Sequence, residues 1–388
     1  MEPAGSGPRR LAAAQRDEQG HSILSHYWPT WSPDGARIAF SSIAVEGAVE
    51  GKSKLSATTY VVGAEGGTPA ALYRSPPGVP PVIAPNVPHY LSWSPDCRHL
   101  AVVAPGAEGL TLFIANVDSG QTVPVMAGAP LFPAWAPDGS RLLLHPGNQL
   151  LMVELSEGVK VSAIAGGAVG FRTPAWSPNG TRIAFAEQPA ENKLNLLTAD
   201  PSGQEVRIEA ELNAPAAFLW SPEGTTIACA TLTNPEAPSY GGLRLLEVKG
   251  GRAVSLTDDE LLAFFWSPDG RRLAYVLPDA TEGLYSWVIL DLREGRRRRL
   301  ASHFPSRDML TLYAFFDQYA HSHQLWSPDG TKLVYSGRLN LNGHTHYGSG
   351  ELESRILVAD VTGEAPANVV GEGSLAFWSR KGGGAAGG

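Results

Sequence analysis

The most regular feature of the chain is a short apolar stretch that ends in tryptophan and is followed by a polar turn and an alternating apolar strand. Around Trp326, for example, Ser-Pro-Asp-Gly follows the tryptophan and the strand-like "KLVYS" occupies 332–336. Proline restricts φ at a turn, an aspartate side chain caps it, and glycine adopts the left-handed conformation. The pattern therefore predicts a β-hairpin whose tryptophan fills the space between neighbouring sheets.

This pattern occurs eight times, in more or less degenerate form. The tryptophans that mark it are Trp31, Trp93, Trp135, Trp176, Trp220, Trp266, Trp326 and Trp378. Their shortest spacings, 41 to 46 residues, match one four-stranded blade of a β-propeller. A second hairpin follows in most repeats, and no long helix is expected. The pattern predicts an all-β chain of four-stranded antiparallel blades.

The pentapeptide resembles the TolB-type propeller repeat, also called the WSPDG or PD40 repeat, and marks a WD40-like repeat protein. That repeat builds the TolB propeller and the propeller domains of prolyl-oligopeptidase-like and tricorn proteases. The resemblance covers nearly the whole chain and implies the fold, whereas function is carried by individual sites.

Residues 9–32 align with residues 355–379. The N-terminal segment is therefore expected to form an outer hairpin whose inner strand comes from residues 374–379. We favour a ring of eight blades that the N- and C-terminal strands close, with seven blades as the alternative. We interpret residues 1–8 as a disordered N-terminus, 9–380 as a single propeller domain, and 381–388 as a flexible glycine-rich tail.

Composition and charge narrow the range of partners. The chain has a normal globular balance, with 43% hydrophobic and 18% charged residues, and its net charge is −8. Nucleic acid is not expected as a partner, because phosphate binding needs a basic surface. The run Arg296–Arg299 is interpreted as a charged outer strand that blocks edge pairing, with a polyanion site as the alternative. Cys97 and Cys229 are expected to be buried thiols rather than a disulfide.

No stretch approaches the ~20 apolar residues of a membrane helix, and residues 1–20 contain no apolar run of signal-peptide length. The chain as written is expected to be cytoplasmic. A processed or truncated N-terminus would change this expectation to a periplasmic or extracellular location. We expect a monomer without a transmembrane segment.

Long insertions between the repeats indicate a binding face. They lie near 41–57, 75–88, 302–320 and 337–354, and blade geometry places all of them on one face of the ring. This loop-rich face is expected to bind a protein or peptide, with a small molecule or a sugar as the alternative ligand. The candidate ligand-binding residues are His26, Arg307, Asp317, Gln318, Tyr319, His321, His323, Arg338, His344 and His346.

Two His-x-His pairs suggest a metal site. In a strand, residues i and i+2 point the same way, so His321 and His323 could reach one ligand. His344 and His346 could complete a shell for manganese or zinc, together with Asp317 or Gln318. The alternative is that these histidines only satisfy backbone groups at the mouth of the ring.

A narrower resemblance concerns the same stretch. Gln318-x-x-His321-x-His323, directly before an aromatic-Ser-Pro-Asp motif, is similar to the metal-binding strand of oligogalacturonate lyases. Those are β-propeller enzymes with a manganese-type site that cleave acidic sugar oligomers by β-elimination. They also use a histidine on the neighbouring inner strand, where this chain has "LLAFFW" at 261–266. The resemblance implies a metal-dependent lyase as one alternative function.

The chain shows no complete catalytic constellation. It has no Gly-x-Ser-x-Gly elbow and no glycine-rich phosphate loop. We therefore favour a non-catalytic propeller, without a certain cofactor, that binds its ligand around the central channel. The TolB resemblance adds a further alternative, an accessory subunit of an envelope complex.

Overall fold

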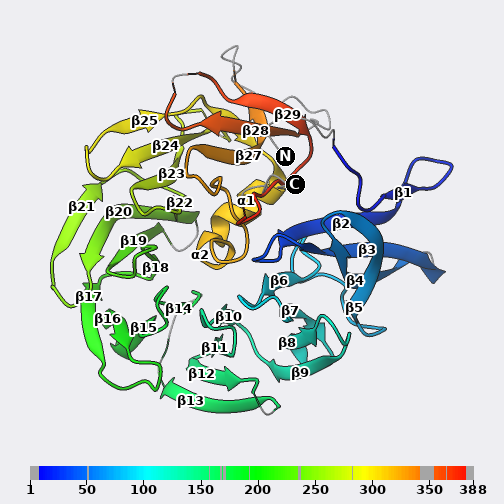
Figure 1. The fold of residues 1–388 in the computed structure, drawn as a ribbon, viewed down its shortest axis with the longest axis horizontal. Coiled ribbons are helices and arrows are strands. Elements are labelled where there is room, and N and C mark those ends of the chain that lie inside the picture. Colours follow the sequence, from blue (N-terminus) through cyan, green and yellow to red (C-terminus); the bar gives the residue numbers. More distant parts are fainter. Residues whose placement is uncertain are drawn as a thin grey trace, which may run out of the picture.

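The computed structural model describes residues 8–381 except 50–51, 157, 167, 169–171, 192, 235–236, 282, 341–353 and 364. Antiparallel sheets stand around a central axis like the blades of a propeller (Figure 1). This arrangement confirms the all-β propeller predicted from the tryptophan repeat. Two short helices lie inside the ring.

The strands follow one another along the chain in the order of the blades. They are β1 (Gln15–Arg16), β2 (Ser22–Trp31), β3 (Arg37–Val49), β4 (Lys52–Gly63), β5 (Gly66–Arg74), β6 (Tyr90–Trp93), β7 (His99–Gly106), β8 (Gly109–Asn116), β9 (Thr122–Ala127), β10 (Leu131–Trp135), β11 (Arg141–Pro146), β12 (Gln149–Glu154), β13 (Lys160–Gly166), β14 (Ala175–Trp176), β15 (Ile183–Ala190), β16 (Lys193–Ala199), β17 (Arg207–Leu212), β18 (Ala216–Trp220), β19 (Thr226–Asn234), β20 (Ala237–Glu247), β21 (Ala253–Thr257), β22 (Ala263–Trp266), β23 (Arg272–Pro278), β24 (Tyr285–Asp291), β25 (Arg297–Arg299), β26 (His303–Pro305), β27 (Lys332–Leu339), β28 (Arg355–Asp360) and β29 (Asn368–Glu372). The helices are α1 (Arg307–Ala314) and α2 (Phe316–Tyr319).

Each blade pairs its strands antiparallel and in sequence order. The blades are β2–β5, with β1 added to β2, then β6–β9, β10–β13, β14–β17, β18–β21 and β22–β25. The next blade consists of β27–β29, with Trp326 bridging Leu333 at its inner side. The short strand β26 pairs with both β24 and β27, so it joins these last two blades into one sheet.

Tryptophan side chains connect consecutive blades, as the repeat predicts. The indole of Trp93 donates to the carbonyl of Thr30, which precedes the previous blade's tryptophan, at 3.1 Å. Trp135, Trp176, Trp266 and Trp326 make the same bond to Ser92, Ala134, Leu219 and Phe265. Each of these tryptophans therefore both fills the space between two sheets and ties their inner strands together.

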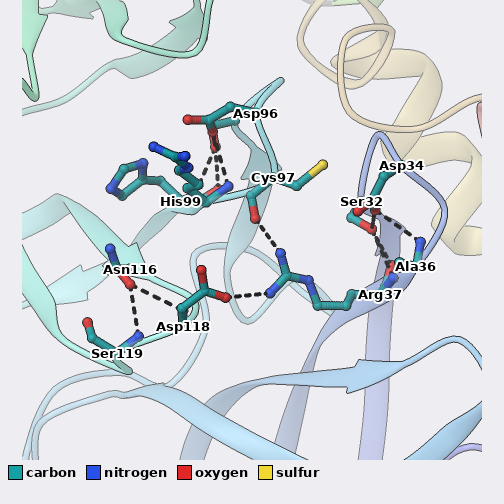
Figure 2. A network of polar contacts seen from close by, with 12 residues as sticks. Ser32, Asp34, Ala36, Arg37, Asp96, Cys97, His99, Asn116, Asp118 and Ser119 are labelled. Carbon is teal, nitrogen blue, oxygen red and sulfur yellow. Dashed lines mark hydrogen bonds and ion pairs between the residues drawn. The ribbon is translucent and has the colours of Figure 1, made fainter.

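An arginine after two of the turns adds a second connection near the tryptophans. The guanidinium of Arg37 lies 5.4 Å from the ring centre of Trp93 in the next blade. It also pairs with Asp118 at 3.0 Å and donates to the carbonyl of Cys97 at 2.6 Å (Figure 2). Arg141 lies over Trp176 in the same way, at 5.2 Å. Such a cation over an aromatic face contributes about 0.5–1 kcal/mol at a partly exposed site.

The turns themselves have the predicted chemistry. In the last complete copy, the hydroxyl of Ser327 donates to Asp329 at 2.5 Å, and the same carboxylate accepts from the amide of Thr331 at 3.0 Å. Gly330 has φ +68°, a conformation that costs glycine little. In the second copy Cys97 takes the place of that glycine and still has φ +63°.

The ring closes between Trp326 and Trp31. Trp31 donates to the carbonyl of Phe377 at 3.3 Å, so residues 377–378 stand where the previous blade's inner strand would be. On the other side, the amide of Trp378 donates to Gln324 at 2.8 Å. We call this contact region of residues 374–380 with Trp31 and Gln324 the seam.

The N-terminal segment differs from the expectation of an outer hairpin built on residues 374–379. β1 pairs instead with β2, because β2 continues for ten residues and its first half pairs with β3. Leu11 and Ala12 pack against Ile38, Phe40 and Val62 of the first blade. The number of blades stays a prediction.

Other segments also differ from their expected form or agree with it. Residues 41–57, expected as a long loop, largely continue β3 and β4, with Val45 opposite Leu55. The arginine run forms the outermost strand of its blade, β25, as expected. Its side chains tie neighbours together, since Arg297 pairs with Asp259 and Arg298 donates to the carbonyl of Asp360. Both cysteines are buried free thiols. In the described part of the chain, neither helix has the length or apolar character to cross a membrane.

Candidate functional site at the centre of the ring

The insertion at 302–320 folds into helices, and its expected form as an irregular loop was wrong. The hydroxyl of Ser306 caps α1 by accepting from the amide of Met309 at 3.1 Å. Met309, Leu312, Tyr313 and Phe316 follow the helical i, i+3, i+4, i+7 spacing and are fully buried. The cap and this spacing are the sequence signals that could have identified the helices.

These helices and the turn after them, residues 307–323, fill the centre of the ring, and we call them the plug (Figure 1). The ring of Tyr319 stacks on Trp28 of the first blade, with 4.6 Å between centroids. Phe316 packs against Phe264 of the blade β22–β25, with 4.7 Å between centroids. The hydroxyl of Tyr90 donates to the carbonyl of Gln318 at 3.2 Å. Separate blades therefore hold the plug from several sides.

Asp317 anchors the plug to the loop before β14. Its carboxylate lies 3.7 Å from the guanidinium of Arg172, and both side chains are largely buried. Burial raises the pKa of Asp317, while Arg172 and the backbone amide of Thr173 act in the opposite direction. The guanidinium of Arg172 also lies 5.1 Å from the ring centre of Tyr240. The acid of the predicted site is thus an internal anchor rather than a group facing solvent.

The two histidines of the plug lie on a turn and not on a strand. The chain stays helical through Ala320, and the amide of His323 donates to the carbonyl of Tyr319 at 2.8 Å. The expectation that His321 and His323 point the same way as strand neighbours therefore does not apply. His321 is exposed, and its carbonyl accepts from Arg380 at 2.6 Å.

His323 is enclosed by aromatic rings. Its ring centre lies 4.5 Å from Phe377, 5.1 Å from Tyr319 and 5.9 Å from Trp28. Its Nδ1 is 2.7 Å from the hydroxyl of Ser322. Burial lowers the pKa of His323 to about 3, so the ring is neutral at physiological pH. His323 serves as packing between the plug and the seam.

The remaining candidates are distributed around the same region. Arg307 is exposed at the start of α1. Arg338 lies on β27 with its guanidinium 5.5 Å from the ring centre of Phe304. His26 lies on β2, where its Nδ1 is 2.7 Å from the hydroxyl of Ser42. His344 and His346 fall outside the described residues. The structure therefore groups Asp317, Gln318, Tyr319, His321 and His323 in the plug and places the other described candidates apart from them.

The described residues do not fit a divalent metal. Among them, no three His, Cys, Asp or Glu side chains lie close enough together to share an ion. The rings around His323 occupy the space that a ligand shell would need, and Asp317 is committed to Arg172. A shell that includes His344 and His346 lies beyond what the structure describes.

Sequence reasoning missed the residues that receive the plug, above all Arg172, Thr173 and Tyr240. The one signal available is that Arg172 is a charged residue directly before an apolar inner strand, "TPAW" at 173–176. A single charge at such a position carries no information about its partner, Asp317, which comes from a distant part of the chain.

Comparison with known proteins gives limited sequence similarity. No protein-family model matches the chain. It is 22% identical over 183 residues to a component of eukaryotic translation initiation factor 3 from Xenopus laevis, which covers 45% of this chain and 24% of that protein. It is 26% identical over 171 residues to the uncharacterized peptidase YuxL of Bacillus subtilis, covering 43% and 22%. The chain thus matches less than a quarter of the length of each relative.

Solved structures are similar over much more of the chain. An oligogalacturonate lyase in complex with manganese has a TM-score of 0.54 and 13% identity, covering 90% of this chain and 95% of that one. A prolyl endopeptidase has a TM-score of 0.58 and 12% identity, covering 90% and 50%. TolB of Acinetobacter baumannii has a TM-score of 0.43 and 17% identity, covering 81% and 75%. At identities this low, the first two structures show a shared fold.

Proposed function

We propose that this protein is a non-catalytic propeller that binds a protein or peptide over the plug, on the loop-rich face. One observation carries the proposal: the plug uses its inner side chains to fix itself in the ring and turns another side of α1 to solvent. Arg307 is exposed at the start of that helix, and Leu310 is 38% exposed one turn later. Arginine beside an exposed apolar side chain is a combination that protein interfaces favour.

Arg338 extends the same face. It lies on β27 opposite Phe304, and β26 leads directly into α1. Two arginines on neighbouring elements suit a partner with acidic side chains around an apolar anchor. The proposal thus narrows the range of candidate ligands to an acidic peptide segment, with a small molecule or a sugar as the less favoured choice.

The test is affinity capture with the full chain from extracts of its source cells, followed by a direct binding measurement with the captured protein. The variant Arg307→Glu/Leu310→Asp should lose that binding by about tenfold or more, because it reverses one charge and removes the apolar anchor. The matched control is Arg296→Glu, on the outer rim, whose side chain is 74% exposed. Equal binding by the wild type and the double variant would contradict the proposed face.

A second candidate function is a metal-dependent lyase acting on acidic sugar oligomers. It is supported by the Gln318-x-x-His321-x-His323 motif and by the similarity to the lyase structure, which contains manganese. The test is metal analysis after loading with Mn²⁺ or Zn²⁺, with a His321→Ala variant as control. Less than one metal per chain in the wild type, or equal metal in the variant, would count against it.

The third candidate is an accessory subunit of an envelope complex, which rests on the TolB-type repeat alone. It requires export, whereas the favoured proposal places the protein in the cytoplasm as a monomer. Fractionation of the full-length gene product separates these two locations, and sedimentation analysis tests the monomer.

A further inference from the structure

A small cavity lies between the loop that anchors the plug and the neighbouring blades. Its volume is about 10 Å³, and its lining includes His145 from β11, Phe185 from β15, Phe218 from β18, and the pair Arg172–Thr173. His145 and Thr173 are each only 3% exposed. Among the described residues, neither His145 Nε2 nor Thr173 Oγ1 has a hydrogen-bond partner.

The chemistry of these two atoms follows from their surroundings. His145 Nδ1 lies 2.9 Å from the carbonyl oxygen of Arg172. A carbonyl oxygen only accepts, so the proton of the neutral ring is on Nδ1 and Nε2 carries a free lone pair. The hydroxyl of Thr173 can both donate and accept. The cavity therefore contains one acceptor and one hydroxyl, both removed from bulk solvent.

We infer that this cavity is a binding site for a single water molecule, which donates to His145 Nε2 and hydrogen-bonds with Thr173 Oγ1. A cavity that holds one water needs roughly 10–15 Å³ and at least two polar partners, and this site has both. A larger ligand does not fit the volume. Burying the two atoms without a partner is costly, which gives the water a reason to stay.

This water also has a place in the attachment of the plug. The guanidinium of Arg172 and the backbone amide of Thr173 both interact with the carboxylate of Asp317. On its other side, this dipeptide is held by His145 at the Arg172 carbonyl and by the water at the Thr173 hydroxyl. The water therefore acts as a positioning element behind the residues that receive Asp317.

The direct test is a high-resolution crystal structure of the full chain. We expect a density peak within roughly 2.7–3.2 Å of both His145 Nε2 and Thr173 Oγ1. Thr173→Val keeps the shape but removes the hydroxyl, and should lose the peak. Thr173→Ser keeps the hydroxyl and should retain it. A wild-type structure with no peak, or with the two atoms paired to other protein groups, overturns the inference.

Two solution measurements complete the test. Nitrogen-15 NMR of the imidazole should show His145 protonated at Nδ1, and a proton on Nε2 contradicts the assigned acceptor. Hydrogen exchange in α2 should become about fivefold faster in Thr173→Val and stay unchanged in Thr173→Ser, because one buried hydrogen-bonded bridge is lost. Equal exchange in the two variants removes the proposed link between the water and the plug.

Discussion

Replacing Arg172 by methionine removes the positive charge that faces the buried Asp317. At a separation of 3.7 Å, the attraction between the two charges is about 4.5 kcal/mol with an effective dielectric constant of 20. Losing one member of a buried ion pair costs about 3–5 kcal/mol, because the other charge stays buried without compensation. We therefore expect Arg172→Met to lower the free energy of unfolding by about 3–5 kcal/mol near pH 8.

The loss should depend on pH in a defined direction. Burial holds the pKa of Asp317 above its ordinary value, and removal of Arg172 raises it further, since Arg172 acts to lower it. A carboxyl whose pKa is higher in the folded state binds more protons folded than unfolded. The variant is therefore penalised most above the raised pKa of Asp317, and the penalty shrinks as pH falls toward its ordinary value near about 4.

The assay is urea unfolding of the wild type and the variant at about pH 8 and about pH 5, followed by tryptophan fluorescence. The matched control is Arg172→Met/Asp317→Asn, which should recover much of the lost stability at high pH because no buried charge remains. A difference from the wild type below about 0.5 kcal/mol refutes the reasoning, since that is the range of ordinary surface changes. A penalty equal at both pH values refutes the assignment to Asp317.

Three further predictions concern the seam, the outer strand and the buried histidines. Phe377→Ala should cost about 2–4 kcal/mol of unfolding free energy, since its ring packs on His323 and its strand closes the ring; an unchanged urea midpoint would contradict this. Arg298→Ala should cost about 1 kcal/mol through its bond to the carbonyl of Asp360. The same change at Arg296, paired with Glu294 at the surface, should cost almost nothing, and equal effects would argue against the tie. His89, His303 and His323 have pKa values lowered to about 3, so stability should be full above about pH 6.5 and fall as pH decreases. His323→Gln should flatten that slope by up to about 1.4 kcal/mol per pH unit, and an unchanged slope would mean that His323 also titrates in the folded protein.

The propeller could be predicted from the sequence because its signal is local and repeated. Each copy contains the whole hairpin within about a dozen residues, so the tryptophan, the proline and the glycine identify strand, turn and strand without any long-range information. The bond from each indole to the preceding blade is then a geometric consequence of placing equal units around an axis. Local chemistry and global fold agree, which is typical of a repeat protein.

The centre of the ring was harder to predict because its contacts join distant residues. "FFDQYAHSH" at 315–323 contains polar residues that suggest a ligand site. In the structure, the carboxylate of Asp317 is satisfied by Arg172 and the carbonyl of Gln318 by Tyr90, and neither partner is near it in the sequence. A polar residue in an insertion can face solvent or another part of the chain, and composition does not distinguish the two cases. The helical spacing of 309–316 was the one local signal for the second outcome.

The bond between Trp31 and Phe377 has a consequence for the order of folding. The two residues are 346 positions apart, and synthesis at roughly 5–20 residues per second separates their appearance by roughly 20–70 s. During that interval the first blade can complete its own hairpins, but the edge that receives Phe377 has no partner from the same chain. The early blade is therefore the part of the nascent protein with the longest exposure to wrong pairing. The packing of Leu11 and Ala12 on Ile38 and Phe40 provides a local cover for that blade throughout the wait.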